Sequence, residues 1–250
     1  MHRRLFISLL VSSFLAGIPT FIEAAEPAKI QVLMVTGDDV SPFHHWREIS
    51  ETTRDVLVWT GKFEVRVCED PAILESASAL EKYDVIAFML YNNSLPMLSD
   101  AGKENLLDFV KGGKGFYVQH LASASYGEWE EFGKLCGRHW VMGTSGHGPR
   151  SVFECDVVDS EHPITEGLED FKIFDELYAK LQGDEEIEVL VEADSDWSGQ
   201  TEPLVFVRPY GKGRSVHNAL GHDHIAIKND SCRVLIARGV EWAATGKVSE

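Results

Sequence analysis

Eight histidines of this 250-residue chain stand in predicted loops or at the ends of predicted strands. Imidazole binds metal ions, and its pKa near neutrality lets it move protons in catalysis. His120 is the most informative of them, because it ends the strand-like run 116–120, and ligands of open α/β sheets bind beyond the carboxyl ends of the strands. The eight are His44, His45, His120, His139, His147, His217, His222 and His224.

Three roles fit His120: contact with a ligand, acid/base chemistry, or metal binding. The alternative is a buried histidine whose nitrogens are satisfied by the core. His147 stands between Gly146 and Gly148, which allow a ligand to approach the backbone closely. Its alternative is a mobile histidine on the surface.

A pair of acidic residues and a second pair of histidines add to this set. Asp175 and Glu176 follow an apolar run, and neighbouring side chains point in different directions, so one can face a pocket while the other caps or meets solvent. His222 and His224 would point to the same side of an extended chain. Together with His120 or His147, they could bind a divalent metal such as zinc. Metal-site candidates are therefore His120, His147 and His222.

The motifs of several well-known catalytic sites are absent from the sequence. There is no Gly-x-Ser-x-Gly elbow, no His-Glu-x-x-His and no Cys-x-x-Cys. The glycines at 112–115 precede a strand instead of opening a helix, which argues against a phosphate-binding loop.

The first half of the chain predicts a parallel sheet. Apolar runs at 29–37, 63–68, 83–90 and 116–120 read as strands. Helical patterns separate them at 49–60, 74–80 and from Ser99 to Val110. This alternation predicts an α/β fold, a doubly wound, mainly parallel sheet with helices on both faces.

The second half predicts an added β-hairpin region. A helix is expected at 126–136, followed by a long, unstructured glycine-rich loop at 137–150 of the kind that covers binding sites. Strands are expected at 151–158, 188–193, 203–207 and 214–219, the last two joined by a turn at 208–213, and a helix at 233–243 closes the chain. We expect residues 26–250 to form a single domain.

Residues 1–25 have the pattern of a secretory signal peptide, with a basic start and an apolar run from Leu5 to Ile18. We therefore expect export to the periplasm or the outside, and no stable membrane insertion after cleavage. Glu23 and Ile22 occupy positions where a small residue is preferred, so a retained anchor stays open. The four cysteines could pair in an exported protein, but at least two read as small buried residues.

The chain is strongly acidic, with 40 Asp and Glu against 23 Lys and Arg and a formal net charge of -17. Such a surface repels phosphate backbones and anionic lipids, which excludes nucleic acid as a partner. A neutral or cationic small ligand fits better.

An ordered set of motifs over almost the whole chain after the leader resembles the ThuA-like (trehalose utilisation) family, whose flavodoxin-like fold is related to class I glutamine amidotransferases. Each motif is weak alone, but their order is specific. The matching segments are 44–46, 83–85, 112–123, 129–137, 147–149, 162–165, 175–178, 210–214, 220–223 and 241–246. Where the family has Gly-Ile-His-x-Ala, this chain has Val118-Gln119-His120-Leu121-Ala122.

The resemblance implies a carbohydrate ligand, a disaccharide or a keto-sugar derivative. It argues against glutamine hydrolysis, because His120 stands where amidotransferases carry their cysteine. We expect His120, Glu176 and His147 to be catalytic. Whether the protein is a hydrolase, lyase or isomerase, a metal-dependent enzyme, or a binding module without catalysis stays open, as does its oligomeric state. The expected substrate-binding residues are His45, Trp46, Tyr91, Trp140, Asp175, Tyr178, His222 and Asp223.

Overall fold

The computed structural model describes residues 28–38 and 43–249. Five parallel strands form one side of a nine-stranded sheet, in the order β2-β1-β3-β4-β11 with β2 at the edge. They are β1 (Ile30–Val35), β2 (Phe63–Cys68), β3 (Val85–Phe88), β4 (Gly115–Gln119) and β11 (Gly213–Asn218). The apolar residues of β3, β4 and β11 are buried, as the sequence predicted, whereas Val65 and Val67 of the edge strand β2 are half-buried.

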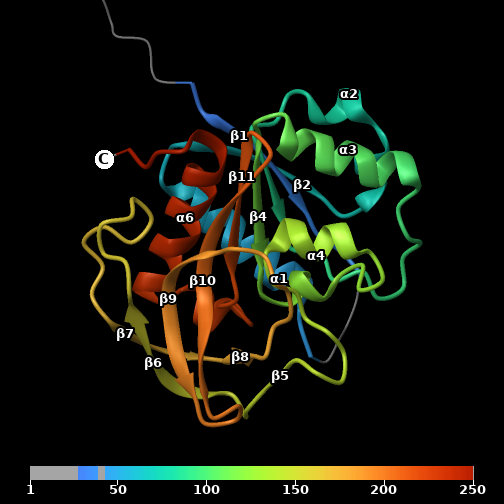
Figure 1. The fold of residues 1–250 in the computed structure, drawn as a ribbon. Coiled ribbons are helices and arrows are strands. Elements are labelled where there is room, and N and C mark those ends of the chain that lie inside the picture. The colour runs from blue at the N-terminus through green and yellow to red at the C-terminus, as the bar shows by residue number, and fades with distance from the viewer. Residues whose placement is uncertain (1–27, 39–42, 250) are drawn as a thin grey trace, which may run out of the picture.

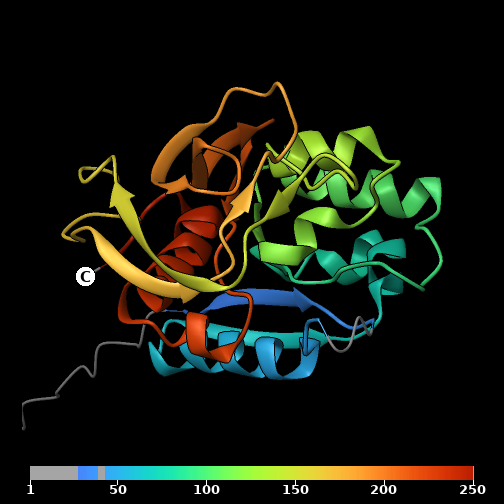
Figure 2. The same cartoon turned by 90° about the horizontal axis from the view of Figure 1, so that it is seen from below.

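Helices cover both faces of these strands (Figures 1 and 2). The longer helices α1 and α6 contact each other and pack with Met34, Tyr117 and Val216 on one face. The helices α3 and α4 pack on the other face with Leu33, Phe88 and Phe116. The four are α1 (Trp46–Trp59), α3 (Asp100–Lys111), α4 (Glu130–Cys136) and α6 (Asp230–Thr245).

Four antiparallel strands extend the sheet beyond β11, in the order β10-β9-β6-β7. They are β6 (Ser151–Val157), β7 (Phe171–Asp175), β9 (Glu188–Ser195) and β10 (Gln200–Tyr210). The strands β10 and β11 form the predicted hairpin, which turns between Tyr210 and Gly213. The predicted fold class is confirmed: a mixed, mainly parallel sheet at its centre, with helices on both faces.

Two local predictions differ from the structure. The helix expected at 74–80 is two short pieces, η1 (Pro71–Glu75) and α2 (Ala77–Leu80), because Ser76 is extended and its side chain caps the second piece. The loop 137–150 is partly ordered by pairing. In it, β5 (Gly146–His147) pairs with β8 (Tyr178–Ala179), and His139 exchanges backbone hydrogen bonds with Gln182.

Two short elements complete the edge where the site lies, η2 (His120–Ala124) after β4 and α5 (His224–Ile227) after β11. None of the helices in the described residues combines the length and the apolar composition needed to cross a bilayer.

Candidate metal centre and pocket

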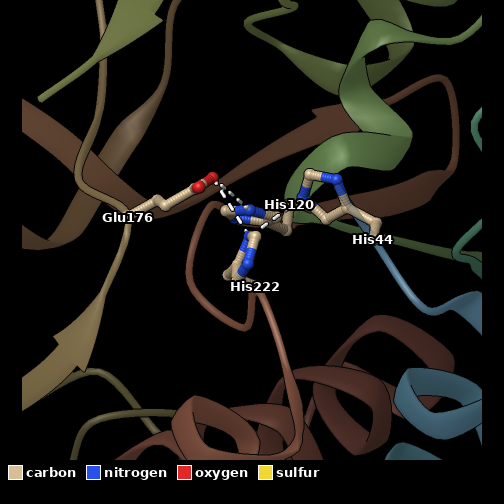
Figure 3. Close-up of side chains that lie close together, drawn as sticks. All are labelled: His44, His120, Glu176 and His222. Carbon is tan, nitrogen blue, oxygen red and sulfur yellow. Dashed lines mark hydrogen bonds and ion pairs between the residues drawn. The ribbon is translucent and has the colours of Figure 1, made fainter. Parts of the chain in front are cut away.

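Four side chains from four separate segments converge at the carboxyl edge of the parallel strands (Figure 3). His44 precedes α1, His120 follows β4, Glu176 follows β7, and His222 follows β11. One nitrogen or carboxylate oxygen from each lies within 4.8 Å of the others. The topology explains this meeting, because β1, β4 and β11 are parallel and end at the same edge.

His120 is held in a fixed orientation. Its φ of 47° is in the left-handed region, which non-glycine residues rarely adopt and which is frequent at functional sites. Its Nδ1 lies 2.7 Å from the carbonyl oxygen of Ala219, and a ring nitrogen can only donate to a carbonyl. The Nε2 lone pair therefore points to the cluster. The imidazole also stacks on the ring of Tyr178, with centroids 3.9 Å apart.

Glu176 lies at the centre of three imidazoles. Its Oε2 is 3.1 Å from Nδ1 of His222 and 3.6 Å from Nε2 of both His120 and His147. Burial by itself would raise the pKa of Glu176, but the interactions with His120 and His222 outweigh it and lower that pKa well below its usual value. The carboxylate is therefore ionised throughout the physiological range.

His44 completes the cluster from the opposite side. Its Nε2 lies 3.1 Å from Nδ1 of His222. Burial, together with the neighbouring His120 and His222, lowers the pKa of His44 to about 2. A neutral imidazole is the form that binds metal ions.

The donor atoms fit a divalent cation such as zinc. Nε2 of His120 and Oε2 of Glu176 are buried and have no hydrogen bond of good geometry. Buried polar atoms are rarely left in this state. Three imidazole nitrogens and one carboxylate oxygen are donors that zinc accepts in proteins. Of the three predicted metal candidates, His120 and His222 belong to the cluster, whereas His147 stands outside it and contacts Glu176.

A pocket of about 580 Å³ opens onto the cluster. Its wall carries Trp140 and Tyr178, whose ring centroids are 4.6 Å apart, and Tyr91. Phe43 and Met142 are exposed at 74% and 64%, so apolar surface borders the pocket. None of the lining residues within 28–38 and 43–249 is a Lys or an Arg. They are Phe43, His44, Tyr91, Asn93, Leu121, Trp140, Met142, His147, Glu176 and Tyr178.

The structure places four other predicted substrate-binding residues away from this wall. His45 is exposed at the start of α1, and Trp46 lines a smaller neighbouring cavity. Asp223 caps α5 and pairs with Arg150. Asp175 is fully buried, and its carboxylate accepts backbone N–H groups from Glu176, Gly221 and His222. Asp175 therefore fixes the backbone of two cluster residues, Glu176 and His222.

The sequence analysis did not predict His44 as a site residue and named the neighbouring His45 instead. The position of His44 after the first predicted strand, at the same sheet edge as His120, could have identified it. Three further histidines of the original eight lie elsewhere. His217 is buried within β11, His139 pairs with Gln182 through its backbone, and His224 contacts Glu48.

Comparison with known proteins identifies the relatives of this fold. A family model described as ThuA, trehalose utilisation, matches residues 31–243. A ThuA-like protein from Parabacteroides merdae superposes with a TM-score of 0.77 at 27% identity, over 89% of this chain and 92% of that one. A cytoplasmic protein from Salmonella typhimurium gives a TM-score of 0.63 at 13% identity, over 86% and 99%. Among curated proteins, none matches the chain.

The fold also extends to a more distant solved structure. A GMP synthase protein from Thermoplasma acidophilum superposes with a TM-score of 0.51 at 11% identity, over 88% of this chain and 97% of that one. This level of identity shows the fold alone.

The predicted export is contradicted by these comparisons, because the Salmonella typhimurium protein of the same fold is described as cytoplasmic. The prediction depended on the residue pattern of the first 25 positions alone, and an apolar run of that length also occurs in buried helices. Residues 1–25 lie outside the described part of the chain. Export is therefore not part of the function proposed below.

Proposed function

Because the chain belongs to the ThuA, or trehalose utilisation, family, we propose that its pocket processes a small carbohydrate at a divalent metal centre formed by His44, His120, His222 and Glu176. The observation that carries this proposal is the convergence of these four side chains beside the pocket. Three imidazole nitrogens and one ionised carboxylate are a donor set that suits zinc.

A metal ion held there would supply Lewis-acid chemistry, polarising a carbonyl or hydroxyl oxygen of the sugar or a bound water. Other residues of the chain hold these metal-binding atoms in a fixed orientation. The carbonyl of Ala219 fixes the tautomer of His120, and the buried Asp175 fixes the backbone of both Glu176 and His222. Such supporting hydrogen bonds typically orient metal ligands.

His147 is the proposed general base. Its Nδ1 lies 2.7 Å from the carbonyl oxygen of Gly148, to which it donates, so Nε2 carries the lone pair. That Nε2 lies 3.6 Å from Oε2 of Glu176 and belongs to the pocket wall. It can therefore accept a proton from a sugar hydroxyl, and the neighbouring carboxylate stabilises the imidazolium that forms.

The rest of the wall favours a neutral sugar. The half-buried rings of Trp140 and Tyr91 can pack against the apolar face of a pyranose. Among the described residues the lining has no cationic side chain, so a phosphorylated or acidic sugar would meet Glu176 without a counter-charge there. These features support a disaccharide or its keto derivative as substrate.

Glutamine hydrolysis is not assigned. It needs a nucleophilic cysteine at the turn after β4, and His120 occupies that turn. Burial raises the pKa of the Cys136, Cys155 and Cys232 thiols, which keeps them protonated and unreactive.

The test combines metal analysis with an activity screen. Protein prepared without an affinity tag should contain stoichiometric zinc or another divalent ion, and should turn over at least one sugar in a panel of disaccharides and keto-sugars. His120→Ala should lose both properties, whereas His45→Ala, an exposed neighbour, should keep them. Saturable sugar binding with no turnover would identify a binding module instead, and a metal-free, fully active protein would refute the metal centre.

A further inference from the structure

A second, much smaller cavity lies behind the histidine cluster. It has a volume of about 30 Å³, and its walls include His44, Gln119, His120 and Gly221. A single water needs roughly 10–15 Å³ of such space and two or more polar partners. The cavity is far too small for a sugar ring but has room for water.

The side chain of Gln119, the last residue of β4, has a fixed orientation. The amide nitrogen of Asn218 donates to the hydroxyl oxygen of Tyr117 at 3.0 Å, and that hydroxyl donates to Oε1 of Gln119 at 3.2 Å. Burial keeps the pKa of Tyr117 well above its usual value, so the phenol remains a donor. Because Oε1 is the end that accepts, the Nε2 end of the amide must point the other way.

This Nε2 group is an unused donor in the interior. Gln119 is 3% exposed, and its Nε2 has no hydrogen-bond partner. It points toward Gly221, where a Cβ atom would come within 2.7 Å of it. Gly221 also has a φ of 104°. Both the lack of space for a Cβ atom and this backbone angle therefore require glycine at the position. An unpaired buried N–H group is costly unless water satisfies it.

His44 presents a second unused nitrogen. Its Nε2 faces His222 in the cluster, whereas its Nδ1 is buried without a partner. A histidine that binds a metal through one nitrogen almost always donates the N–H of the other to a carboxylate, a carbonyl or a water. Within the described residues, no carboxylate or carbonyl oxygen makes that bond with Nδ1 of His44.

We propose that the cavity binds one internal water molecule, which accepts hydrogen bonds from Nε2 of Gln119 and Nδ1–H of His44. The inference rests on the metal centre proposed above and adds a residue to it. Gln119 is a positioning residue that acts through the water: it holds His44 in the tautomer whose Nε2 lone pair faces the cluster. The chain Asn218–Tyr117–Gln119–water–His44 thereby connects β11 and β4 to the segment before α1.

The test compares the wild type with Gln119→Met, which keeps the length of the side chain but removes the amide. A high-resolution crystal structure of the wild type should show one water in the cavity, and nitrogen NMR shifts should show His44 protonated at Nδ1. Gln119→Met should lose the water, give a mixture of His44 tautomers, and bind zinc about 10- to 100-fold more weakly.

Two further variants separate positioning from general destabilisation. Tyr117→Phe leaves Gln119 in place but releases its orientation, and should shift the His44 tautomer in the same direction. Asn105→Leu, on α3, removes a side-chain hydrogen bond to the carbonyl of Leu74 and should leave tautomer and zinc affinity unchanged. A dry cavity in the wild type, or a Gln119→Met protein with unaltered tautomer and zinc affinity, would overturn the inference. If the wild type binds no zinc, the proposed metal centre is refuted. The water and the His44 tautomer would still test the positioning role of Gln119.

Discussion

Asp175 and Glu176 are adjacent in the chain, yet their surroundings shift their pKa values in opposite directions. Burial raises the pKa of Asp175, and its oxygens accept backbone N–H groups from Glu176, Gly221 and His222. Glu176 also loses solvent, but the imidazoles of His120 and His222 lower its pKa. The first carboxylate therefore holds the backbone together, and the second presents charge to the pocket.

We predict that Asp175→Asn weakens zinc binding and lowers the free energy of unfolding by about 1–3 kcal/mol, because one buried N–H group loses its acceptor. Zinc titration and urea unfolding measure the two effects. The matched control is Glu241→Gln, a buried carboxylate that binds Lys62 and Ser249 far from the site. It should lose stability without losing zinc affinity, and equal zinc affinity in both variants would contradict the positioning role of Asp175.

Glu176→Gln should lower kcat/KM by about 100-fold or more, because the amide removes the charge that binds metal and stabilises protonated His147. Sugar turnover and metal content both report on this variant. Glu185→Gln, which breaks an ion pair with Arg208 on another surface, should behave like the wild type. Tolerance of Glu176→Gln in a protein that still binds sugar would favour the binding module.

The pocket wall makes a separate prediction about affinity. Trp140→Leu should raise KM about 10-fold and change kcat less, because a lost stacking contact is worth roughly 0.5–1.5 kcal/mol beyond its buried area. Steady-state kinetics over a range of sugar concentrations separate the two constants. Trp59, exposed at 86% on α1, supplies the control, and Trp59→Leu should leave both constants unchanged.

Stability should fall on acidification because of His217. Burial lowers its pKa to about 3 from the usual 6.5. Between those values the unfolded chain binds a proton that the folded chain does not, so the free energy of unfolding decreases as pH falls through this window, by up to about 1.4 kcal/mol per pH unit. In chemical unfolding at several pH values, His217→Phe should show a shallower slope than the wild type and His45→Gln the same slope. An unchanged slope in His217→Phe would show that another group is responsible.

The sheet was predictable because buried parallel strands are short, continuous apolar runs, and β1, β3 and β4 are of this kind. The strand β7 was harder to identify, because its alternating buried and exposed residues depend on the pairing with β6. Ser76 shows the same limit for helices, since one capping side chain divides a continuous helical pattern.

The candidate site was predictable where a residue follows a strand directly, as His120 does. It was not predictable where the choice lay between neighbours. Which of His44 and His45 faces inward depends on the path of the chain into α1, and which of Asp175 and Glu176 is buried depends on the amides of Gly221 and His222. Both choices are made by segments that are distant in the sequence.

The spread of the cluster along the chain has a consequence for folding. His44 and His222 meet across 178 residues, so no fragment that lacks either end can assemble the full set of donors. A bound ion would act as a cross-link between the first and last crossovers of the sheet, and its binding free energy would add to that of folding. A bound metal ion would therefore indicate that the segments around His44 and His222 have both reached their folded positions.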